Sequence, residues 1–244
     1  MPNDTPADLS AHTGERAAPA VGDGLGPVEG ADENVLPTQV HHAPAGSSIP
    51  DGTAGSLVFL KQFLRHPVQV GAVAPSSPSL VRQMVEWIDW GSARSVVEYG
   101  PGTGVFTEAI RSRLHPEGRF FAIEQAPDLA TLTRARCPGT QVYEASAADV
   151  GRLCDIEGID SIDAILCGLP WAAFPESLQR QIMEATVQRL RPGGQFATFA
   201  YWQGVVLPAG RRFSRRLRHT FSSVHRSPTA WRNLPPAFVY RCRK

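Results

Sequence analysis

The segment VVEYGPGTGVFTEAI, residues 96–110, constrains the fold more than any other part of the chain. Val96 and Val97 have the apolar, β-branched character of a buried strand, and residues 107–110 have the character of a helix start. Between them stand three alternating glycines, Gly100, Gly102 and Gly104. A strand, a glycine turn and a helix in succession bring backbone N–H groups and the positive end of a helix close to a ligand. We therefore predict a ligand-binding turn at the carboxyl end of a buried strand.

The remainder of the chain alternates between strand-like and helix-like stretches. Strands are predicted at residues 95–98, 119–124, 140–144, 164–167 and 195–201, and helices at 105–114, 128–136 and 177–190. Strands separated by helical lengths favour an α/β fold with a doubly wound, mostly parallel sheet. Near the end, residues 221–224 and 237–241 predict two more strands that pair antiparallel at one sheet edge.

The first 55 residues differ in composition from the rest. Residues 1–55 contain eight acids, one base, and no aromatic residue or cysteine, so they are predicted to be a disordered acidic leader. They lack the basic start and apolar core of a signal peptide. Residues 56–90 are predicted to be a helical segment with helices at 57–64 and 80–87, and residues 91–244 to be the ligand-binding domain.

The cysteines do not suggest a metal site or a disulfide framework. The four of them, Cys137, Cys154, Cys167 and Cys242, show no Cys-x-x-Cys pairing and no histidine-rich partner spacing. We therefore expect no bound metal and a reducing, cytoplasmic environment.

An acid beside the glycine turn narrows the choice of ligand. Glu98 stands two residues before Gly100, where its carboxylate would repel the pyrophosphate of a dinucleotide. S-adenosylmethionine carries an ammonium, which an acid at a strand end can hold. A second acid, Glu124, ends the next predicted strand, where a carboxylate can accept ribose hydroxyls. Together these features favour S-adenosylmethionine over NAD. The alternative is that both acids are solvated strand ends and the glycines only form a turn.

With these motifs the chain resembles the class I S-adenosylmethionine-dependent methyltransferases from about residue 95 to residue 244. The resemblance implies a Rossmann-like sheet of seven strands whose last strand is inserted antiparallel. It also implies an adenine contact after the third strand, where the usual Asp is replaced by Ser146, so that either Ser146 or Asp149 serves. The cofactor-binding residues implied in this way are Glu98, Tyr99, Gly100, Gly102, Thr103, Gly104, Glu124, Ser146, Ala147, Gly168 and Leu169.

The loop CGLPWAAFP, residues 167–175, follows the fourth strand, where the methyl group would emerge. Ribosomal RNA adenine dimethylases carry Asn-Leu-Pro-Tyr at this place. Here Trp171 has a ring that can stack on a base, but Gly168 has no side chain to hold an exocyclic amine. An RNA adenine N6-methyltransferase or a small-molecule methyltransferase therefore remains the alternative function, and a non-catalytic binder of membrane or RNA a third.

A closer resemblance is to the bacterial phospholipid N-methyltransferases of the soluble, peripheral type. It is carried by FLKQFLRHPVQVGAVAPSSPSL, by the Leu-Pro-x-x-x-x-Pro loop at residues 169–175, and by WRNLPPAFVYR near the end. The resemblance implies methylation of the phosphatidylethanolamine head group toward phosphatidylcholine. It also implies peripheral, reversible docking on the cytoplasmic face of the membrane.

The charge of the C-terminal segment is consistent with an anionic partner. Residues 211–244 contain ten bases and no acid, and RRFSRRLRHTF has helical spacing with Phe213 and Leu217 on one side. A basic amphipathic helix suits an anionic phospholipid surface. Alternatively, Phe213 and Leu217 pack on the sheet and the arginines are solvated, or the cluster binds RNA phosphates.

Methyl transfer from a sulfonium is an in-line displacement, so the acceptor must be held close and aligned. Trp171 and Tyr201 are the predicted catalytic residues, because their rings can surround a methylated ammonium by cation–π attraction. For Trp171 simple packing is the alternative. Several side chains are candidates for a general base, and the sequence does not choose among them: His66, His219, His225, Tyr99 and Tyr201.

Overall fold

The computed structural model describes residues 76–244. The predicted leader, residues 1–55, and the predicted helix at 57–64 lie outside the described residues, as does His66. The second predicted helix is present as α2 (Pro78–Val85), with Ser77 as its N-cap accepting a hydrogen bond from the backbone N–H of Leu80.

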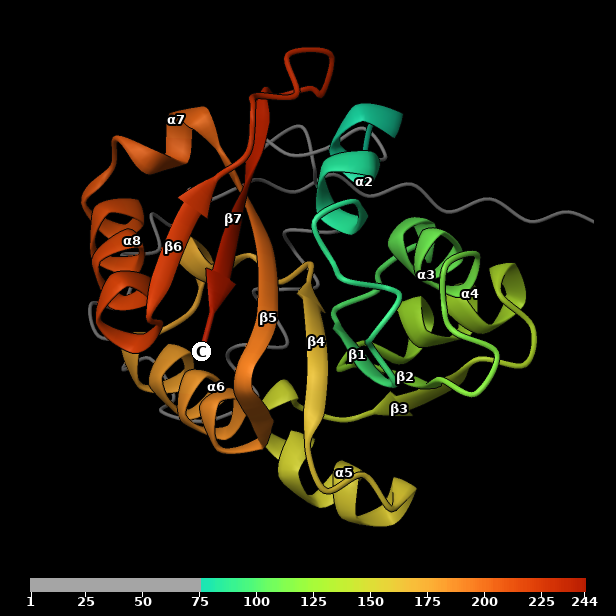
Figure 1. The fold of residues 1–244 in the computed structure, drawn as a ribbon. Coiled ribbons are helices and arrows are strands. Elements are labelled where there is room, and N and C mark those ends of the chain that lie inside the picture. The colour runs from blue at the N-terminus through green and yellow to red at the C-terminus, as the bar shows by residue number, and fades with distance from the viewer. Residues whose placement is uncertain (1–75) are drawn as a thin grey trace, which may run out of the picture. The chain divides into compact units, whose positions relative to one another are not determined.

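The described residues form a single seven-stranded sheet in the order β3-β2-β1-β4-β5-β7-β6 (Figure 1). The strands are β1 (Ser95–Tyr99), β2 (Arg119–Glu124), β3 (Gln141–Glu144), β4 (Ile162–Cys167), β5 (Leu190–Tyr201), β6 (Ser223–Arg226) and β7 (Ala237–Arg243). Strands β1 to β5 are parallel to one another. Strand β7 lies between β5 and β6 and is antiparallel to both. The prediction of a doubly wound, mostly parallel sheet with an inserted antiparallel last strand is confirmed.

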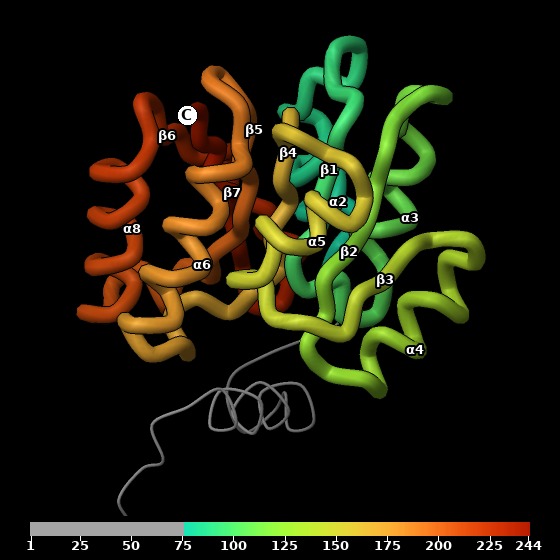
Figure 2. The backbone as a smooth tube through the Cα atoms, turned by 90° about the horizontal axis from the view of Figure 1, so that it is seen from below, coloured from blue at the N-terminus to red at the C-terminus, as the bar shows by residue number. Residues whose placement is uncertain are grey.

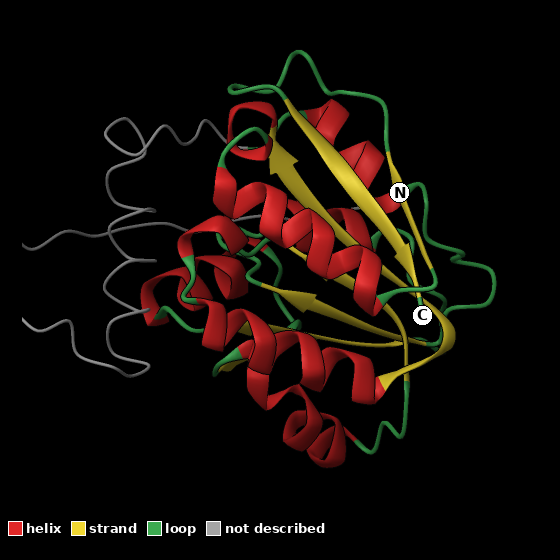
Figure 3. Ribbon diagram, turned by 90° about the vertical axis from the view of Figure 1, so that its left-hand side faces the viewer, coloured by secondary structure: helices red, strands yellow, loops and turns green. Residues whose placement is uncertain are grey.

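Helices cover both faces of this sheet. They are α3 (Val105–Arg111), α4 (Pro127–Arg136), α5 (Val150–Glu157), α6 (Glu176–Arg189), α7 (Trp202–Val205) and α8 (Pro208–Thr220), with short 3-10 turns η1 (Ala147–Asp149) and η2 (Trp171–Ala173). Buried side chains of α5, α6 and α8 pack on one face, which Figure 3 shows from the helix side, and those of α2 and α3 on the other. Figure 2 shows the strands from below, between these helices.

Side chains alternate along β1, so that successive residues contribute to the hydrophobic cores on opposite faces of the sheet. All five of its residues are buried, as expected for a central parallel strand. Val97 and Tyr99 enter the core with α5 and α6, whereas Val96 enters the core with α2 and α3. Glu98 shares the face of Val96, so that it points toward α3.

Three features differ from the sequence prediction. The eight-residue helix α5 was not predicted, since it is short and contains Gly151. Strand β5 begins at Leu190, five residues earlier than predicted, and runs through the Arg-Pro-Gly-Gly segment. Strand β6 begins at Ser223, two residues later than predicted, because Phe221 caps α8 and packs in the core.

Helix α8 has the predicted amphipathic pattern, but its apolar side faces the protein. Phe213 and Leu217 are buried in the core, and the ring of Phe213 stacks on that of Trp171 at 4.9 Å between centroids. The arginines occupy the outer side, where Arg212 pairs with Glu176 at 2.8 Å. The alternative in which Phe213 and Leu217 pack on the sheet is therefore the one observed, and these two side chains are not available to enter a bilayer.

Asp163 joins the amino ends of the two central strands. One carboxylate oxygen accepts hydrogen bonds from the backbone N–H groups of Arg94 (2.8 Å) and Ser95 (2.9 Å), and the other pairs with Arg191. Burial alone would raise the pKa of this carboxyl group, but the hydrogen bonds outweigh burial and lower the pKa below its ordinary value.

We expect Asp163→Asn to lower the free energy of unfolding by about 1–3 kcal/mol at pH 7, since the backbone N–H donors of Arg94 and Ser95 lose a charged acceptor. Because the pKa is lower in the folded chain than in the unfolded chain, this stabilisation is present above about pH 4 and is lost as the pH falls through the folded-state value. Urea unfolding at pH 7 and pH 3 measures the difference. Asp160→Asn, an exposed acid two residues before β4, is the control. Equal destabilisation at both pH values would contradict the assignment.

Candidate functional site

The predicted glycine turn lies at the carboxyl end of β1. Gly100, Gly102 and Gly104 have φ angles of 66°, 60° and 80°, in the left-handed region that side chains with a Cβ rarely adopt. Gly104 is the N-cap of α3. A Cβ built on Gly102 would meet no atom within 4 Å, so open space lies over this residue. Thr103, also predicted at this site, is exposed on the same turn.

Glu98 is buried beside this turn with one oxygen unsatisfied. It is 1% exposed, and its Oε2 accepts a hydrogen bond of 2.7 Å from the hydroxyl of Thr107 on α3. Its Oε1 has no hydrogen-bond partner among residues 76–244. Burial raises the pKa of this carboxyl group to about 8, although the Thr107 hydrogen bond opposes the shift. A buried carboxyl oxygen without a donor is costly unless a ligand supplies one.

Glu124 is the last residue of β2, and its carboxylate contacts the glycine turn. Its Oε2 accepts from the backbone N–H of Gly102 at 3.2 Å, and its Oε1 from that of Ala126 at 3.0 Å. Burial raises its pKa, and the backbone hydrogen bonds oppose that shift. The two predicted acids therefore flank the glycine turn from neighbouring strands, as parallel pairing of β1 with β2 requires.

Two threonines that sequence reasoning missed fix this arrangement. Thr107 orients Glu98, and Thr133 on α4 donates its hydroxyl to the carbonyl oxygen of Gly102 at 3.0 Å. Both side chains are fully buried. The signal available in the sequence was a hydroxyl on the apolar side of each helix, where an aliphatic residue is usual.

Gly168 and Leu169 bring the end of β4 against the glycine turn. The N–H of Gly168 donates to the carbonyl oxygen of Tyr99 at 2.7 Å. A Cβ on Gly168 would lie 2.6 Å from the carbonyl oxygen of Gly100, a distance that real Cβ atoms essentially never show. The side chain of Leu169 packs over Gly100. Residue 168 is therefore restricted to glycine, because the backbone of Gly100 occupies the space that a Cβ at residue 168 would need.

Tyr99 reaches this site only with its backbone. Its side chain is fully buried on the opposite face of the sheet, where its phenol oxygen accepts from the hydroxyl of Thr186 at 3.2 Å. Burial raises the pKa of this phenol far above its ordinary value. Tyr99 is therefore wrong as a candidate general base, because its side chain alternates with that of Glu98 and points away from the turn. Its predicted place among the cofactor-binding residues stays a prediction for its backbone.

The residues after β3 form the N-terminal cap of the 3-10 turn η1. The hydroxyl of Ser146 accepts from the backbone N–H of Ala148 at 3.2 Å, while the carboxylate of Asp149 accepts from the N–H of Ser146 at 3.3 Å. Ala147 is buried in the core. Both candidates for the adenine contact thus belong to one capping box, which fixes the backbone of this loop.

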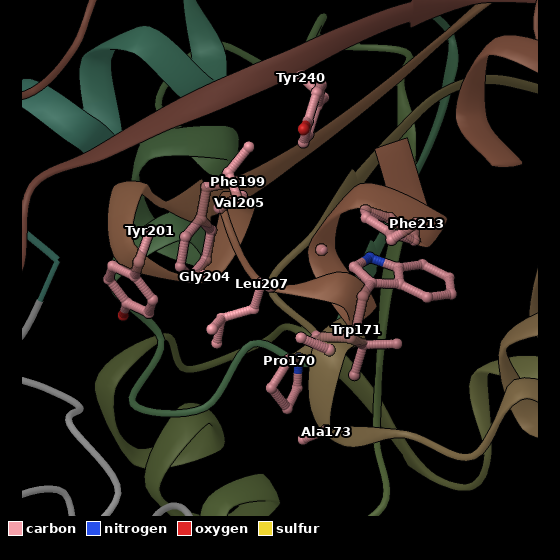
Figure 4. A pocket seen from close by; sticks show the side chains of 15 residues that line it. Pro170, Trp171, Ala173, Phe199, Tyr201, Gly204, Val205, Leu207, Phe213 and Tyr240 are labelled. Atoms are coloured by element: carbon pink, nitrogen blue, oxygen red, sulfur yellow. The ribbon is translucent and has the colours of Figure 1, made fainter. Parts of the chain in front are cut away.

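A cavity of about 340 Å³ opens beyond Gly168, at the carboxyl ends of β4 and β5 (Figure 4). Aromatic rings from four elements surround it, with Leu207 between them in this view. Its lining is Gly168, Leu169, Pro170, Trp171, Ala172, Ala173, Phe199, Ala200, Tyr201, Gly204, Val205, Leu207, Gly210, Phe213 and Tyr240. No acidic or basic side chain belongs to this set.

The two predicted catalytic aromatics both line this cavity. Trp171 is 3% exposed, donates its indole N–H to the hydroxyl of Thr198 at 3.1 Å, and stacks on Phe213. It is therefore a packed wall of the cavity. Tyr201 is partly exposed, and burial raises the pKa of its phenol to about 12, so it is neutral at physiological pH. His219 and His225 are exposed and are not among the lining residues.

No group of three or more His, Cys, Asp or Glu side chains that could hold a metal ion occurs within residues 76–244. None of the helices described here is long and apolar enough to cross a membrane.

Known proteins share this architecture. An ornithine lipid N-methyltransferase from Singulisphaera acidiphila is 37% identical over 189 residues, which are 76% of this chain and 94% of that protein. A protein-L-isoaspartate O-methyltransferase from Ignicoccus hospitalis is 33% identical over 86 residues, 32% of this chain and 41% of that protein. The solved structure of the N-methyltransferase NodS from Bradyrhizobium japonicum WM9 with S-adenosyl-L-homocysteine superposes with a TM-score of 0.56 at 14% identity, covering 78% of this chain and 98% of that one. At this identity the last likeness shows the fold alone.

The family comparison agrees with the geometry of the glycine turn. The model of the protein-L-isoaspartate(D-aspartate) O-methyltransferase family matches residues 58–195, a range that includes β1, the glycine turn, Glu124 and Gly168. The unpartnered buried oxygen of Glu98 and the open space over Gly102 fit a ligand that carries an ammonium group. The chain therefore belongs to this family of class I methyltransferases, and it is an enzyme that uses S-adenosylmethionine as its methyl donor.

Proposed function

We propose that this methyltransferase transfers a methyl group to the primary amine of a membrane aminolipid, with phosphatidylethanolamine as the expected acceptor. The uncharged aromatic cavity beside the glycine turn is the observation that carries this proposal. The ornithine lipid N-methyltransferase of S. acidiphila, whose name gives a lipid amine as acceptor, is a relative over most of both chains.

The cavity favours an amine over a carboxylate as the methyl acceptor. Burial without a charged partner disfavours the charged form of any group. An ammonium that enters such a cavity loses its proton more readily and becomes a nucleophile. A carboxylate gains a proton there and becomes a poor one. No lysine or arginine lines the cavity to compensate a carboxylate, which argues against the isoaspartate chemistry named for the family model.

S-adenosylmethionine supplies an electrophilic methyl group on a sulfonium. We assign its ammonium to the free Oε1 of Glu98 and its ribose hydroxyls to Glu124, with the adenine contact made at Ser146 and Ala147. Gly168 and Leu169 border both the glycine turn and the cavity, so they separate the cofactor space from the acceptor space by one loop.

The reaction needs little beyond alignment. The ammonium of the acceptor would lose a proton to water before the transfer, which frees the lone pair for attack on the methyl carbon as the carbon–sulfur bond breaks. The methylated product, which forms as an ammonium, would release its own proton afterwards. Among the described base candidates only Tyr201 lines the cavity, and it is neutral. Its ring can instead stabilise the methylated ammonium by cation–π attraction.

The role of Glu98 predicts how cofactor binding depends on pH. Because the free enzyme carries a Glu98 carboxyl group with a pKa of about 8, binding an ammonium beside it requires loss of a proton below that pH. Affinity for S-adenosyl-L-homocysteine should rise by up to about tenfold per pH unit between pH 6 and pH 8. Calorimetric titration measures this rise. Glu98→Gln should bind more weakly and lose most of the pH dependence, while the exposed control Glu117→Gln should behave as the parent protein. Identical pH profiles for all three would contradict the role.

The acceptor is tested directly with labelled S-adenosylmethionine. The purified protein is offered anionic vesicles containing phosphatidylethanolamine, vesicles containing ornithine lipid, ribosomal RNA, or no acceptor. We expect label in the lipid fraction with phosphatidylethanolamine. Label only in ornithine lipid would keep the aminolipid class and correct the head group. Label only in RNA would overturn the proposal.

Two substitutions at Tyr201 distinguish a contribution of its aromatic ring from proton transfer by its hydroxyl. Tyr201→Phe keeps the ring and should retain kcat within about threefold, with an unchanged pH–rate profile, because the phenol does not ionise below about pH 12. Tyr201→Leu should lose on the order of tenfold in kcat. Steady-state kinetics on vesicle substrate measure both. A loss in Tyr201→Phe as large as that in Tyr201→Leu would show that the hydroxyl, not the ring, matters.

A further inference from the structure

Five large apolar side chains are exposed on two neighbouring segments of the chain. Trp202, Val206 and Leu207 follow β5 and are 40%, 59% and 55% exposed, while Trp231 and Leu234 lie between β6 and β7 and are 72% and 69% exposed. We call these five residues the apolar rim. Within residues 76–244 the other exposed large apolar side chains are Leu132 on α4 and Ile156 on α5.

The two segments of the apolar rim are joined at the carboxyl edge of the sheet. Tyr201 at the end of β5 pairs with Ala237 at the start of β7, so the chain leaves one strand and enters the other at the same edge. The backbone N–H of Trp202 donates to the carbonyl oxygen of Pro236 at 3.0 Å, and its indole N–H to the hydroxyl of Thr229 at 2.8 Å. Figure 1 shows α7 and the β6–β7 loop at the same end of the molecule.

The β6–β7 loop holds its two apolar side chains outward. Asn233, between Trp231 and Leu234, is 1% exposed, accepts from the backbone N–H of Ser77 at 2.9 Å, and donates to the carbonyl oxygen of Pro235 at 2.7 Å. The loop is thus anchored at its centre to the start of α2. Trp231 and Leu234, on either side of this anchor, remain exposed to solvent.

The cavity and the apolar rim share a residue. Leu207 lines the cavity and is more than half exposed, with Val206 exposed beside it. An apolar surface therefore continues from the acceptor cavity to the outside of the molecule.

Positive charge lies beside both segments of the rim. The last acidic residue of the sequence is Glu184, so the remaining 60 residues contain no acid. Arg211 and Arg232 are exposed next to the two segments and form no ion pair within the described residues. Arg212 pairs with Glu176, and its side chain is 54% exposed.

We propose that the apolar rim is the surface by which the enzyme docks on an anionic bilayer, with Arg211 and Arg232 contacting the head groups. This inference rests on the proposed lipid acceptor, because docking here places the cavity mouth against the membrane surface. Tryptophan is enriched at bilayer interfaces, and exposed apolar side chains combined with arginine bind anionic lipid surfaces. The role expected for the apolar side of α8 thus falls to the α7 segment and the β6–β7 loop, and α8 contributes charge through Arg211.

The test uses the double variant Trp231→Ala/Leu234→Ala, whose positions lie outside the cavity and the cofactor site. Its matched control is Leu132→Ala/Ile156→Ala, which removes comparable exposed apolar surface on α4 and α5. Flotation with phosphatidylcholine vesicles containing phosphatidylglycerol measures docking. We expect at least a tenfold loss of vesicle-bound protein for the rim variant and no change for the control. Unfolding curves check that both variants fold.

Activity provides the second measurement. Methylation of vesicle aminolipid should fall with docking in the rim variant, whereas methylation of a short-chain aminolipid, soluble as monomers, should not change. Equal flotation of parent protein and rim variant would overturn the docking surface and leave the aminolipid acceptor untouched. Binding of the parent protein to RNA but not to these vesicles would also overturn it. A rim-dependent flotation without methylation of any aminolipid would support the docking surface and refute the acceptor.

Discussion

The close approach of the Gly100 carbonyl oxygen to the backbone of Gly168 sets the distance between the glycine turn and the aromatic cavity. Two central parallel strands end there, and the missing Cβ at residue 168 allows the two loops to meet. On one side of this contact lie the glycine turn and its acids, and on the other lies the aromatic cavity. A side chain at residue 168 would force these two spaces apart, and an in-line displacement depends on their separation.

The two spaces have opposite electrostatic character. The turn is flanked by Glu98 and Glu124, both buried and both with raised pKa values, which suits a cationic ligand whose arrival favours their ionised forms. The cavity has no charged lining, so it favours the neutral form of an amine. The loop at the end of β4 therefore separates the acidic glycine turn, which attracts a cation, from the uncharged cavity, which favours deprotonation of an ammonium. This division is consistent with a cationic donor and a neutral nucleophile meeting at a single carbon.

The sequence could predict whatever depends on local pattern. The glycine turn, the strand-end acids, the sheet and the inserted antiparallel strand all have such patterns, and all are present. What it could not supply depends on packing between distant segments. The hydrogen bond between the Tyr99 phenol oxygen and Thr186 joins residues 87 positions apart, and the burial of Phe213 follows from its partner Trp171, 42 positions earlier in the chain. The anchor formed by Asn233 joins residues 156 positions apart. No periodicity in the sequence signals any of these three contacts.

The uncharged lining of the cavity has a consequence for repeated turnover on one acceptor. A primary, secondary or tertiary amine can enter neutral, because the ammonium form of each carries a proton that it can release. A quaternary ammonium has none, so its charge persists in a cavity that offers ring faces but no carboxylate. For the proposed aminolipid acceptor, the fully methylated head group is therefore the one form in the series that must stay charged in this cavity, where ring faces alone can hold it.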